Sequence, residues 1–267
     1  MPQHIRMPAV AGTFYPASFA ALQSTVTELL DAAPRFELRE LRALIVPHAG
    51  YRYSGAIAAT AFKQLASIHP PCETILLLGP AHRVFVDGVA AGTFDAMETP
   101  LGRVPVDVVG QSCLLAKGRP FLCHDAAHEP EHCLEVELPF LQRLLPAVRV
   151  IPLLLGDTDP TLVAGHLLEF VRQPSTTLLV VSSDLSHYYP YDEAVRRDRT
   201  LLDALLAGNA AAVGRQQACG MHAILTLMAL AQQLGWQPHL LDYRNSGDTA
   251  GRKDAVVGYA AVAYTAA

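Results

Sequence analysis

Short runs of Leu, Val and Ile recur along this chain, each closed by Gly, Pro or Ser, and they constrain its fold more than any other feature. Four of them occupy residues 42–47, 74–79, 148–156 and 177–183. Runs of this length and composition are typical of buried strands. Segments with helical periodicity lie between the runs, so strands and helices alternate along the chain. The alternation predicts a layered α/β/α fold around a central sheet.

Five segments have the apolar spacing of amphipathic helices. They are residues 54–65, 134–144, 160–171, 192–206 and 221–234. Two other regions depart from the alternation. Residues 89–107 predict a turn between short strands, and the stretches 239–248 and 255–264 predict two further strands near the end of the chain. We therefore expect a mixed, largely parallel sheet. Because the chain has no internal repeat or long linker, we expect residues 1–267 to form a single domain.

The composition excludes several classes of protein. Hydrophobic residues make up 51% of the 267 residues and charged residues only 17%, which excludes a disordered chain and a coiled coil. The formal net charge of −5 provides no basic surface for nucleic acid. No apolar run approaches the roughly 18 residues of a membrane span, and the amino terminus lacks the apolar core of a signal peptide. The five cysteines have no C-x-x-C spacing, so we expect a reducing, cytoplasmic location.

Polar side chains follow three of the apolar runs, each just beyond the carboxyl end of the expected strand. His48 follows the first run, His82 the second, and Asp184 and His187 the fourth. Because the carboxyl ends of parallel strands line the ligand crevice of an open α/β sheet, these side chains can converge on one point. A lone histidine is more often a structural residue, but three together favour a site for a transition metal or for proton transfer. The residues alone leave open which histidine has which role.

Cys219 immediately precedes the expected helix 221–234. The positive end of a helix dipole lowers the pKa of a thiol there and favours a thiolate, which could bind a metal. The alternative is a small buried hydrophobic residue, which is the usual state of a free cysteine.

A second histidine cluster has the four-residue spacing of one helical face: His124, His128 and His132. Pro130 interrupts any such helix, because proline removes a hydrogen bond and clashes with the preceding turn. We therefore expect a loop followed by a helix that starts near His132, and no all-histidine metal site.

Seven motifs, in this order, resemble those of the Memo family, named in animals as mediators of cell motility and in prokaryotes as the AmmeMemoRadiSam system protein B. They are AGTFYP at residues 11–16, PHAGYRYSG at 47–55, LGPAH at 78–82, EHCLEVELPFL at 131–141, SSDLSH at 182–187, CGMH at 219–222 and VVGYAA at 256–261. The resemblance covers nearly the whole chain. It implies a LigB-like fold, similar to that of the class III extradiol dioxygenases, which hold non-haem Fe(II) with two histidines and a carboxylate.

The resemblance also implies roles for individual residues. His48 and His82 match the two histidine ligands, and Cys219 takes the place of the carboxylate. His187 matches the acid/base histidine of the dioxygenases, and Asp184, three residues earlier, is expected to orient it. Fe(II) is the first expectation for a single bound metal ion. Because a thiolate is softer than a carboxylate, the site could also hold copper, and two histidines with a cysteine would suit zinc as well. The expected substrate pocket consists of Phe14, Tyr15, Tyr51, Arg83, His132, Glu135 and His222.

Three positions depart from the pattern of the animal members. Phe14 stands in place of a tryptophan, Arg83 in place of a second histidine after His82, and Cys133 in place of a serine. None of them removes an expected ligand. Arg83 beside the metal would favour an anionic substrate.

These features lead to one expected function and two alternatives. We expect a metal-dependent redox enzyme of dioxygenase type whose substrate is unknown. The first alternative is a non-catalytic binding or scaffold protein that uses the same crevice for a peptide or protein, and the weaker one is a zinc-dependent hydrolase. The expected crevice ligand is a small molecule or a peptide. Family association adds AMMECR-type and radical-SAM proteins as partners, and we expect neither nucleic acid nor membrane.

Overall fold

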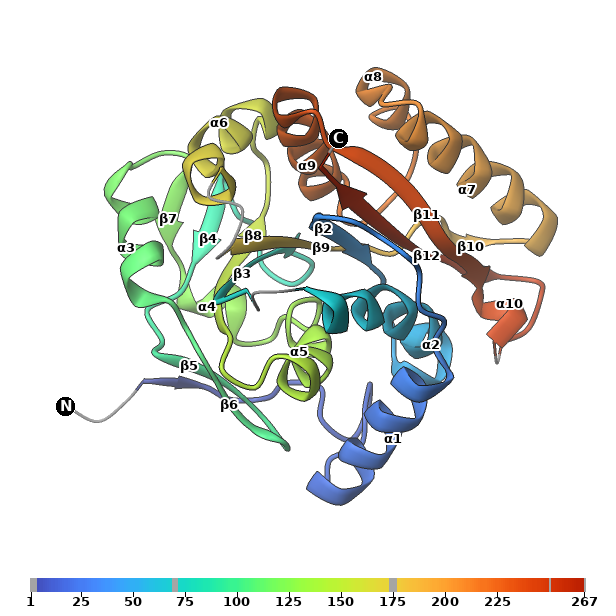
Figure 1. Ribbon diagram of the computed structural model, residues 1–267, viewed down its shortest axis with the longest axis horizontal. Coiled ribbons are helices and arrows are strands. Elements are labelled where there is room, and N and C mark those ends of the chain that lie inside the picture. Colours follow the sequence, from blue (N-terminus) through green and yellow to red (C-terminus); the bar gives the residue numbers. More distant parts are fainter. Residues whose placement is uncertain (1–3, 69–71, 173–176, 250, 267) are drawn as a thin grey trace.

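The computed structural model describes residues 4–68, 72–172, 177–249 and 251–266, and in this part of the chain nine strands form one large sheet (Figure 1). The strands are β2 (Leu41–Val46), β3 (Thr74–Pro80), β4 (Val89–Ala91), β7 (Phe121–Cys123), β8 (Arg149–Leu155), β9 (Thr177–Ser182), β10 (His187–Tyr189), β11 (Gln237–Asn245) and β12 (Val256–Thr265). Their order is β10-β12-β2-β9-β3-β8-β4-β7, and β11 also pairs with β12.

The centre of this sheet is parallel and its flanks are mixed. β2, β9, β3 and β8 run parallel, whereas β12 is antiparallel to β2 and β4 is antiparallel to β8. The four parallel strands correspond to the four apolar runs, whose side chains are buried on both faces. The two strands expected near the end of the chain are the antiparallel pair β11 and β12. The predicted mixed, largely parallel sheet is confirmed.

Helices cover both faces of the sheet (Figure 1). One face packs against α1 (Phe19–Ala32), α2 (Tyr51–Phe62) and α5 (Leu138–Leu144). The other packs against α3 (Val108–Ala116), α6 (Pro160–Val171), α7 (Tyr191–Leu206) and α9 (Met221–Leu234). Shorter helices are η1 (Lys63–Ser67), α4 (Asp125–His128), η2 (Glu135–Glu137), α8 (Ala210–Val213) and α10 (Ser246–Thr249).

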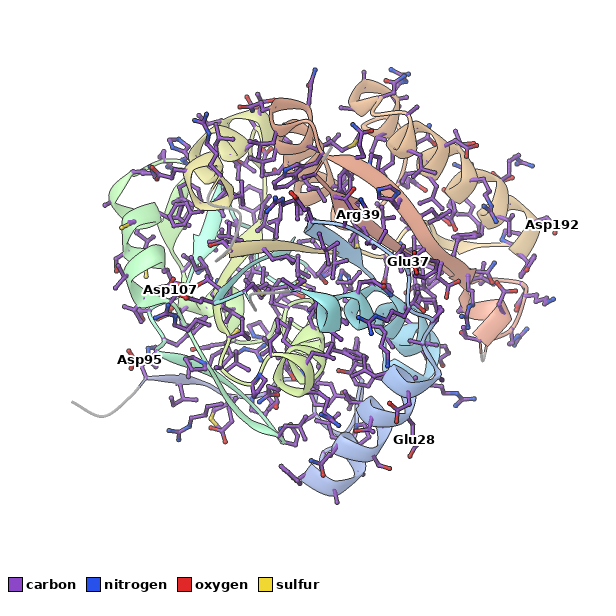
Figure 2. All side chains as sticks on the ribbon, viewed as in Figure 1. Glu28, Glu37, Arg39, Asp95, Asp107 and Asp192 are labelled. Carbon is purple, nitrogen blue, oxygen red and sulfur yellow. The ribbon has the colours of Figure 1, made fainter. Side chains whose placement is uncertain are left out.

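Alternation along β2 shows how one strand serves both cores. Leu44 and Val46 belong to the core under α1, α2 and α5, whereas Ala43 and Ile45 belong to the core on the opposite face. Charged side chains such as Glu28 on α1 and Asp192 on α7 lie at the outside of the molecule (Figure 2). The layered α/β/α architecture predicted from the sequence is confirmed.

A second, three-stranded sheet is formed by β1 (Ile5–Arg6), β5 (Ala96–Thr99) and β6 (Gly102–Pro105). β5 and β6 are antiparallel and form the turn between short strands that the sequence predicts. β1 joins β5 in parallel, which brings the start of the chain beside them. In the described part of the chain, every helix is too short or too polar to cross a lipid bilayer.

Candidate metal centre

The candidate residues lie just beyond the carboxyl ends of three neighbouring strands, at one edge of the sheet. β2, β9 and β3 lie side by side and run parallel, so their carboxyl ends meet. His48 follows β2, Asp184 follows β9, and His82 follows β3. The short connections after these strands keep the three side chains close to the edge.

Cys219 reaches the same edge because α9 begins directly against the end of β9. The amide of Cys219 donates to the carbonyl of Asp184 at 3.2 Å. Gly220 makes this approach possible, since an added Cβ would lie 2.7 Å from the Cβ of Ser183 and 2.8 Å from the carbonyl oxygen of Ser182. A side chain at position 220 would therefore push the start of α9 away from the sheet.

Two histidines and the cysteine form a compact set of possible metal ligands. One ligand atom each from His48, His82 and Cys219 lies within 4.8 Å of the others. Sγ of Cys219 is 3.2 Å from Nε2 of His48, and the rings of His48 and His82 meet edge to face with centroids 5.2 Å apart. Two imidazoles and a sulfur at this separation can bind a single transition-metal ion.

His48 is held on both its backbone and its ring. Its amide donates to Oδ1 of Asp184 at 2.9 Å, and its Nδ1 lies 2.7 Å from Oγ of Ser182. Burial lowers the pKa of the His48 imidazole well below its ordinary value, and the neighbouring His82 and His132 lower it further. The ring is therefore neutral at physiological pH, which is the form that binds metals.

Glu131 holds His82 in a similar way. Its Oε2 accepts the backbone N–H of His82 at 2.6 Å, and its Oε1 lies 2.9 Å from Nδ1 of the same residue. Burial by itself would raise the pKa of this carboxyl group, but its hydrogen bonds to His132 and His82 outweigh burial and lower the pKa well below the usual range. A carboxylate therefore lies behind the His82 ring, on the side opposite Nε2.

The environment of Cys219 corrects one expectation. Burial raises the pKa of its thiol, the Asp184 charge raises it further, and hydrogen bonds from the Asp184 and Gly220 backbone oppose the shift only in part. The expected lowering by the helix dipole is thus outweighed by burial, which the sequence does not reveal. A metal that binds here must displace the thiol proton, and the Asp184 amide, 3.1 Å from the sulfur, helps to stabilise the resulting thiolate.

The pairing expected between Asp184 and His187 is also corrected. Asp184 accepts the backbone N–H of His48 and also interacts with the backbone of Ala49, while burial raises its pKa to about 7. His187 interacts instead with the backbone of Leu185, and burial lowers its pKa. The reason is the chain path: His187 already starts β10, which pairs with β12 and turns away from Asp184. Asp184 therefore supports the His48 loop.

A cavity of about 900 Å³ lies beside the two candidate histidine ligands. His48, His82, Asp184 and His187 line it, and so do three of the expected pocket residues, Phe14, Arg83 and His132. The ring of His132 stacks on His82 with centroids 4.9 Å apart. The wall therefore combines imidazoles with two guanidinium groups, those of Arg83 and Arg252.

Aromatic side chains that the sequence analysis did not single out complete this wall. Tyr53, Tyr188 and Tyr259 line the cavity, and Tyr188 is 76% exposed. Tyr188 has a φ of 63° at an irregularity in the pairing of β10 with β12. A bulge of this kind redirects a side chain, and here it turns a phenol ring toward the cavity mouth. The motif around residue 188 could have pointed to this residue, because two tyrosines follow His187 directly.

Four of the expected pocket residues lie elsewhere. Glu135 is fully buried in an ion pair with Arg6 and accepts the Tyr15 hydroxyl, and Tyr51 donates to the carbonyl of Val136 at 2.6 Å. His222 lies half-buried in the first turn of α9 and does not line the cavity. Tyr15, Tyr51 and Glu135 thus hold the segments behind the cavity together.

The segment around Pro130 does not form one helix. α4 ends at His128, a turn follows, and helical structure resumes only with η2, three residues after His132. Nε2 of His128 donates to the carbonyl of Ala90 at 3.1 Å. Among the described residues, neither His124 nor His128 belongs to a group that could hold a metal.

Comparisons with known proteins agree with this architecture. Residues 6–263 match a family described as Memo-like protein. Proteins named MEMO1 family protein from Ignicoccus hospitalis and Aeropyrum pernix are each 36% identical to this chain, and the matches cover 97% of it and 98% and 99% of those proteins. The corresponding protein of Sulfolobus acidocaldarius is 33% identical, with 97% and 99% covered.

A solved structure shares the fold. It is the crystal structure of an uncharacterized protein, JW3007, from Escherichia coli K12, with a TM-score of 0.53 and 13% sequence identity. The match covers 84% of this chain and 99% of that one. At this identity the likeness concerns the fold alone.

Proposed function

This chain belongs to the Memo-like protein family, and from that premise we propose that it is a metal-dependent redox enzyme related to the extradiol dioxygenases. The observation that supports the proposal most is the approach of His48, His82 and Cys219 to within 4.8 Å, beside a large cavity that the two histidines line. A crevice that only bound peptides would have no need of two imidazoles and a sulfur in this arrangement.

The donor set fits one transition-metal ion. Among the described residues, His48 and His82 each have a ring nitrogen with no hydrogen-bond partner outside the ligand set, and Cys219 supplies a soft third ligand. Fe(II) is the ion we propose first, and copper and zinc also suit this set. When bound, the ion would supply a Lewis-acidic, redox-active centre.

The residues of the chain would prepare that centre for a reaction. His48 remains neutral, Asp184 fixes its loop, and Cys219 gives up its proton when the ligand set is completed. His187 lies on the cavity wall, where burial lowers its pKa and the Asp198 charge opposes that shift only in part, so a neutral imidazole there could accept and return a proton. Arg83 on the same wall favours substrates that carry a negative charge.

Metal binding is tested with anaerobically purified protein. We expect about one metal ion per chain, and Co²⁺ added to the metal-free protein should give the absorption of a cobalt–thiolate bond. Cys219→Ser should abolish that absorption, whereas Cys113→Ser, at an exposed cysteine, should leave it unchanged. A normal cobalt–thiolate spectrum in Cys219→Ser would refute the proposed ligand set.

Redox activity is tested separately by O₂ uptake of the iron-loaded protein with catechols, thiols and indolic compounds. Uptake that depends on both the substrate and Cys219 would support the enzyme. Metal binding with no uptake for any of these classes would favour the non-catalytic binding protein.

A further inference from the structure

Both histidines of the candidate metal centre turn one ring nitrogen toward the same short segment, residues 131–137. Nδ1 of His82 lies 2.9 Å from Oε1 of Glu131. Nδ1 of His48 reaches Glu137 through Ser182, whose Oγ is 2.7 Å from Nδ1 and 2.9 Å from Oε1 of Glu137. A ring nitrogen that carries a proton cannot bind a metal, so these contacts decide which nitrogen is free.

Glu131 is surrounded by N–H donors. Besides the His82 amide on Oε2, the amides of His132 and Cys133 donate to Oε1 at 2.9 and 3.2 Å. The side chain is 1% exposed, so water does not compete for these positions. Because Oε1 is an acceptor for its other neighbours, Nδ1 of His82 must donate to it, and in the neutral ring Nε2 then carries no proton.

The hydroxyl of Ser182 has a single proton and three neighbours. One of them, the carbonyl oxygen of Cys133 at 2.7 Å, can only accept, so the hydroxyl proton points there. The other two neighbours must then donate to Oγ: Nδ1–H of His48 and the carboxyl group of Glu137. Glu137 is therefore a neutral carboxylic acid, and Nε2 of His48 is left without a proton.

Two further observations agree with a neutral Glu137. Its Oε2 has no hydrogen-bond partner in the part of the chain that the structure describes, although the side chain is fully buried. A bare buried oxygen costs much less on a neutral acid than on a carboxylate. Burial also raises the pKa of Glu137 well above its ordinary value.

We propose that Glu131 and Glu137 are the positioning residues of this centre. Glu131 accepts the Nδ1 proton of His82, whereas Glu137 donates to Ser182, which accepts the Nδ1 proton of His48. Both rings are thereby held with Nε2 free of a proton. The proposal rests on the proposed function only in that the centre binds a metal, because the two tautomers already exist in the metal-free protein. Two carboxyl side chains six positions apart thus each fix the tautomer of one histidine, Glu131 as a carboxylate and Glu137 as a neutral carboxylic acid.

Amide substitutions separate these two forms. Both oxygens of Glu131 accept N–H groups, so Glu131→Gln would place an NH₂ donor opposite another donor and lose a hydrogen bond that holds His82. We expect this change to weaken Co²⁺ binding about 10–100-fold. Glu137→Gln keeps a donor toward Ser182 and a bare oxygen in place of Oε2, so the affinity should change by no more than a factor of a few. Glu129→Gln, at an exposed position two residues before this segment, is the matched control and should bind as the wild type does.

The tautomers are measured directly by two-bond ¹⁵N–¹H correlation NMR on the metal-free wild-type protein, without reference to activity. We expect His48 and His82 both to carry the proton on Nδ1. A proton on Nε2 of either ring overturns the proposal, and so does a loss of cobalt affinity in Glu137→Gln as large as in Glu131→Gln. If Glu131→Gln does not fold, the NMR result decides; if the wild type binds no cobalt, the proposed function fails while the tautomers still test this inference.

Discussion

His128 and His132 are four residues apart, yet they have opposite surroundings. His132 lies on the cavity wall, where its ring also contacts Phe14 with centroids 4.8 Å apart. His128 is 2% exposed, and burial lowers its pKa to about 4 despite the hydrogen bond to Ala90. The turn at Pro130 separates them, so their shared spacing in the sequence has no structural meaning.

The buried His128 predicts a pH-dependent stability. Its pKa is lower in the folded chain than in the unfolded chain, where it is about 6.5, so its contribution is fully present above pH 6.5 and is lost as the pH falls toward 4. Between pH 7 and pH 5 this loss amounts to about 2 kcal/mol. Urea unfolding at both pH values should show a correspondingly smaller drop for His128→Gln. An equal drop in the variant and the wild type would show that His128 titrates normally.

His187 carries a prediction about proton transfer. His187→Gln should keep nearly full metal occupancy, because three other residues supply the ligands, and should lower any turnover by about 10²–10⁴-fold. Metal analysis of the variant checks the predicted occupancy, and O₂ uptake of the same preparation checks the predicted loss of turnover. Loss of the metal in this variant would make His187 a ligand and leave Cys219 as the doubtful member of the set.

At the scale of elements, helix α9 supports the site through Gly220, the residue just before its first turn. Gly220→Ala should force the start of α9 away from β9, with a cost of about 1–3 kcal/mol in unfolding free energy and weaker Co²⁺ binding, because Cys219 moves with the helix. Gly165→Ala is the control: Gly165 is exposed on α6 and has open space around it, so the change should stabilise the protein by about 0.5–1 kcal/mol. Thermal unfolding and cobalt titration measure both, and a stabilised Gly220→Ala protein with intact binding would contradict this account.

The elements also show what the sequence could predict. Two predicted helices match α6 and α9, and the segment 192–206 matches α7 to within one residue. In each of them the apolar residues recur at helical spacing along the face that is buried. The segment 54–65 is displaced: α2 starts at Tyr51 and its end tightens into η1, a common change at a helix terminus.

Helix α1 was not predicted, although its signal is present. Ser18 accepts the amide of Ala21 as its N-cap, and Leu22, Val26 and Leu30 repeat at four-residue spacing toward the core. The helix lies outside the alternation of strands and helices on which the fold prediction depended.

The site was predictable only in part, for a physical reason. Strand ends determine that His48, His82 and Asp184 gather at one edge, and that follows from apolar runs alone. Hydrogen-bond partners depend on side-chain directions that periodicity does not contain. Glu131 and Ser182 lie within the family motifs, yet nothing in their spacing shows that they contact the two histidines.

At the scale of the whole molecule, Arg6 ties the small sheet to the site. It comes from β1, pairs with the fully buried Glu135, and donates to the backbone carbonyl groups of His128 and Glu131. The turn that carries Glu131 is thereby fixed from the opposite side of the cavity wall.

Arg6→Ala should therefore be severe. It leaves the Glu135 carboxylate buried without its cation, which costs about 3–5 kcal/mol, and it frees the turn that positions His82. Arg119→Ala removes an exposed pair with Asp87 and should cost no more than about 1 kcal/mol. Chemical denaturation measures the free energy of unfolding of both variants, and an equal loss would show that the buried ion pair stabilises the protein no more than the exposed one does.

The place of β12 in the sheet has a consequence for how the protein is made. β12, the last strand of the chain, pairs with β2, one of the first. At about 5–20 residues per second, a ribosome needs on the order of 10–40 s to make the chain between them. Throughout that interval the apolar edge of β2 has no partner on this side, and Cys219 does not yet exist for most of it. A ribosome-bound chaperone can therefore engage the nascent chain well before a metal ion can.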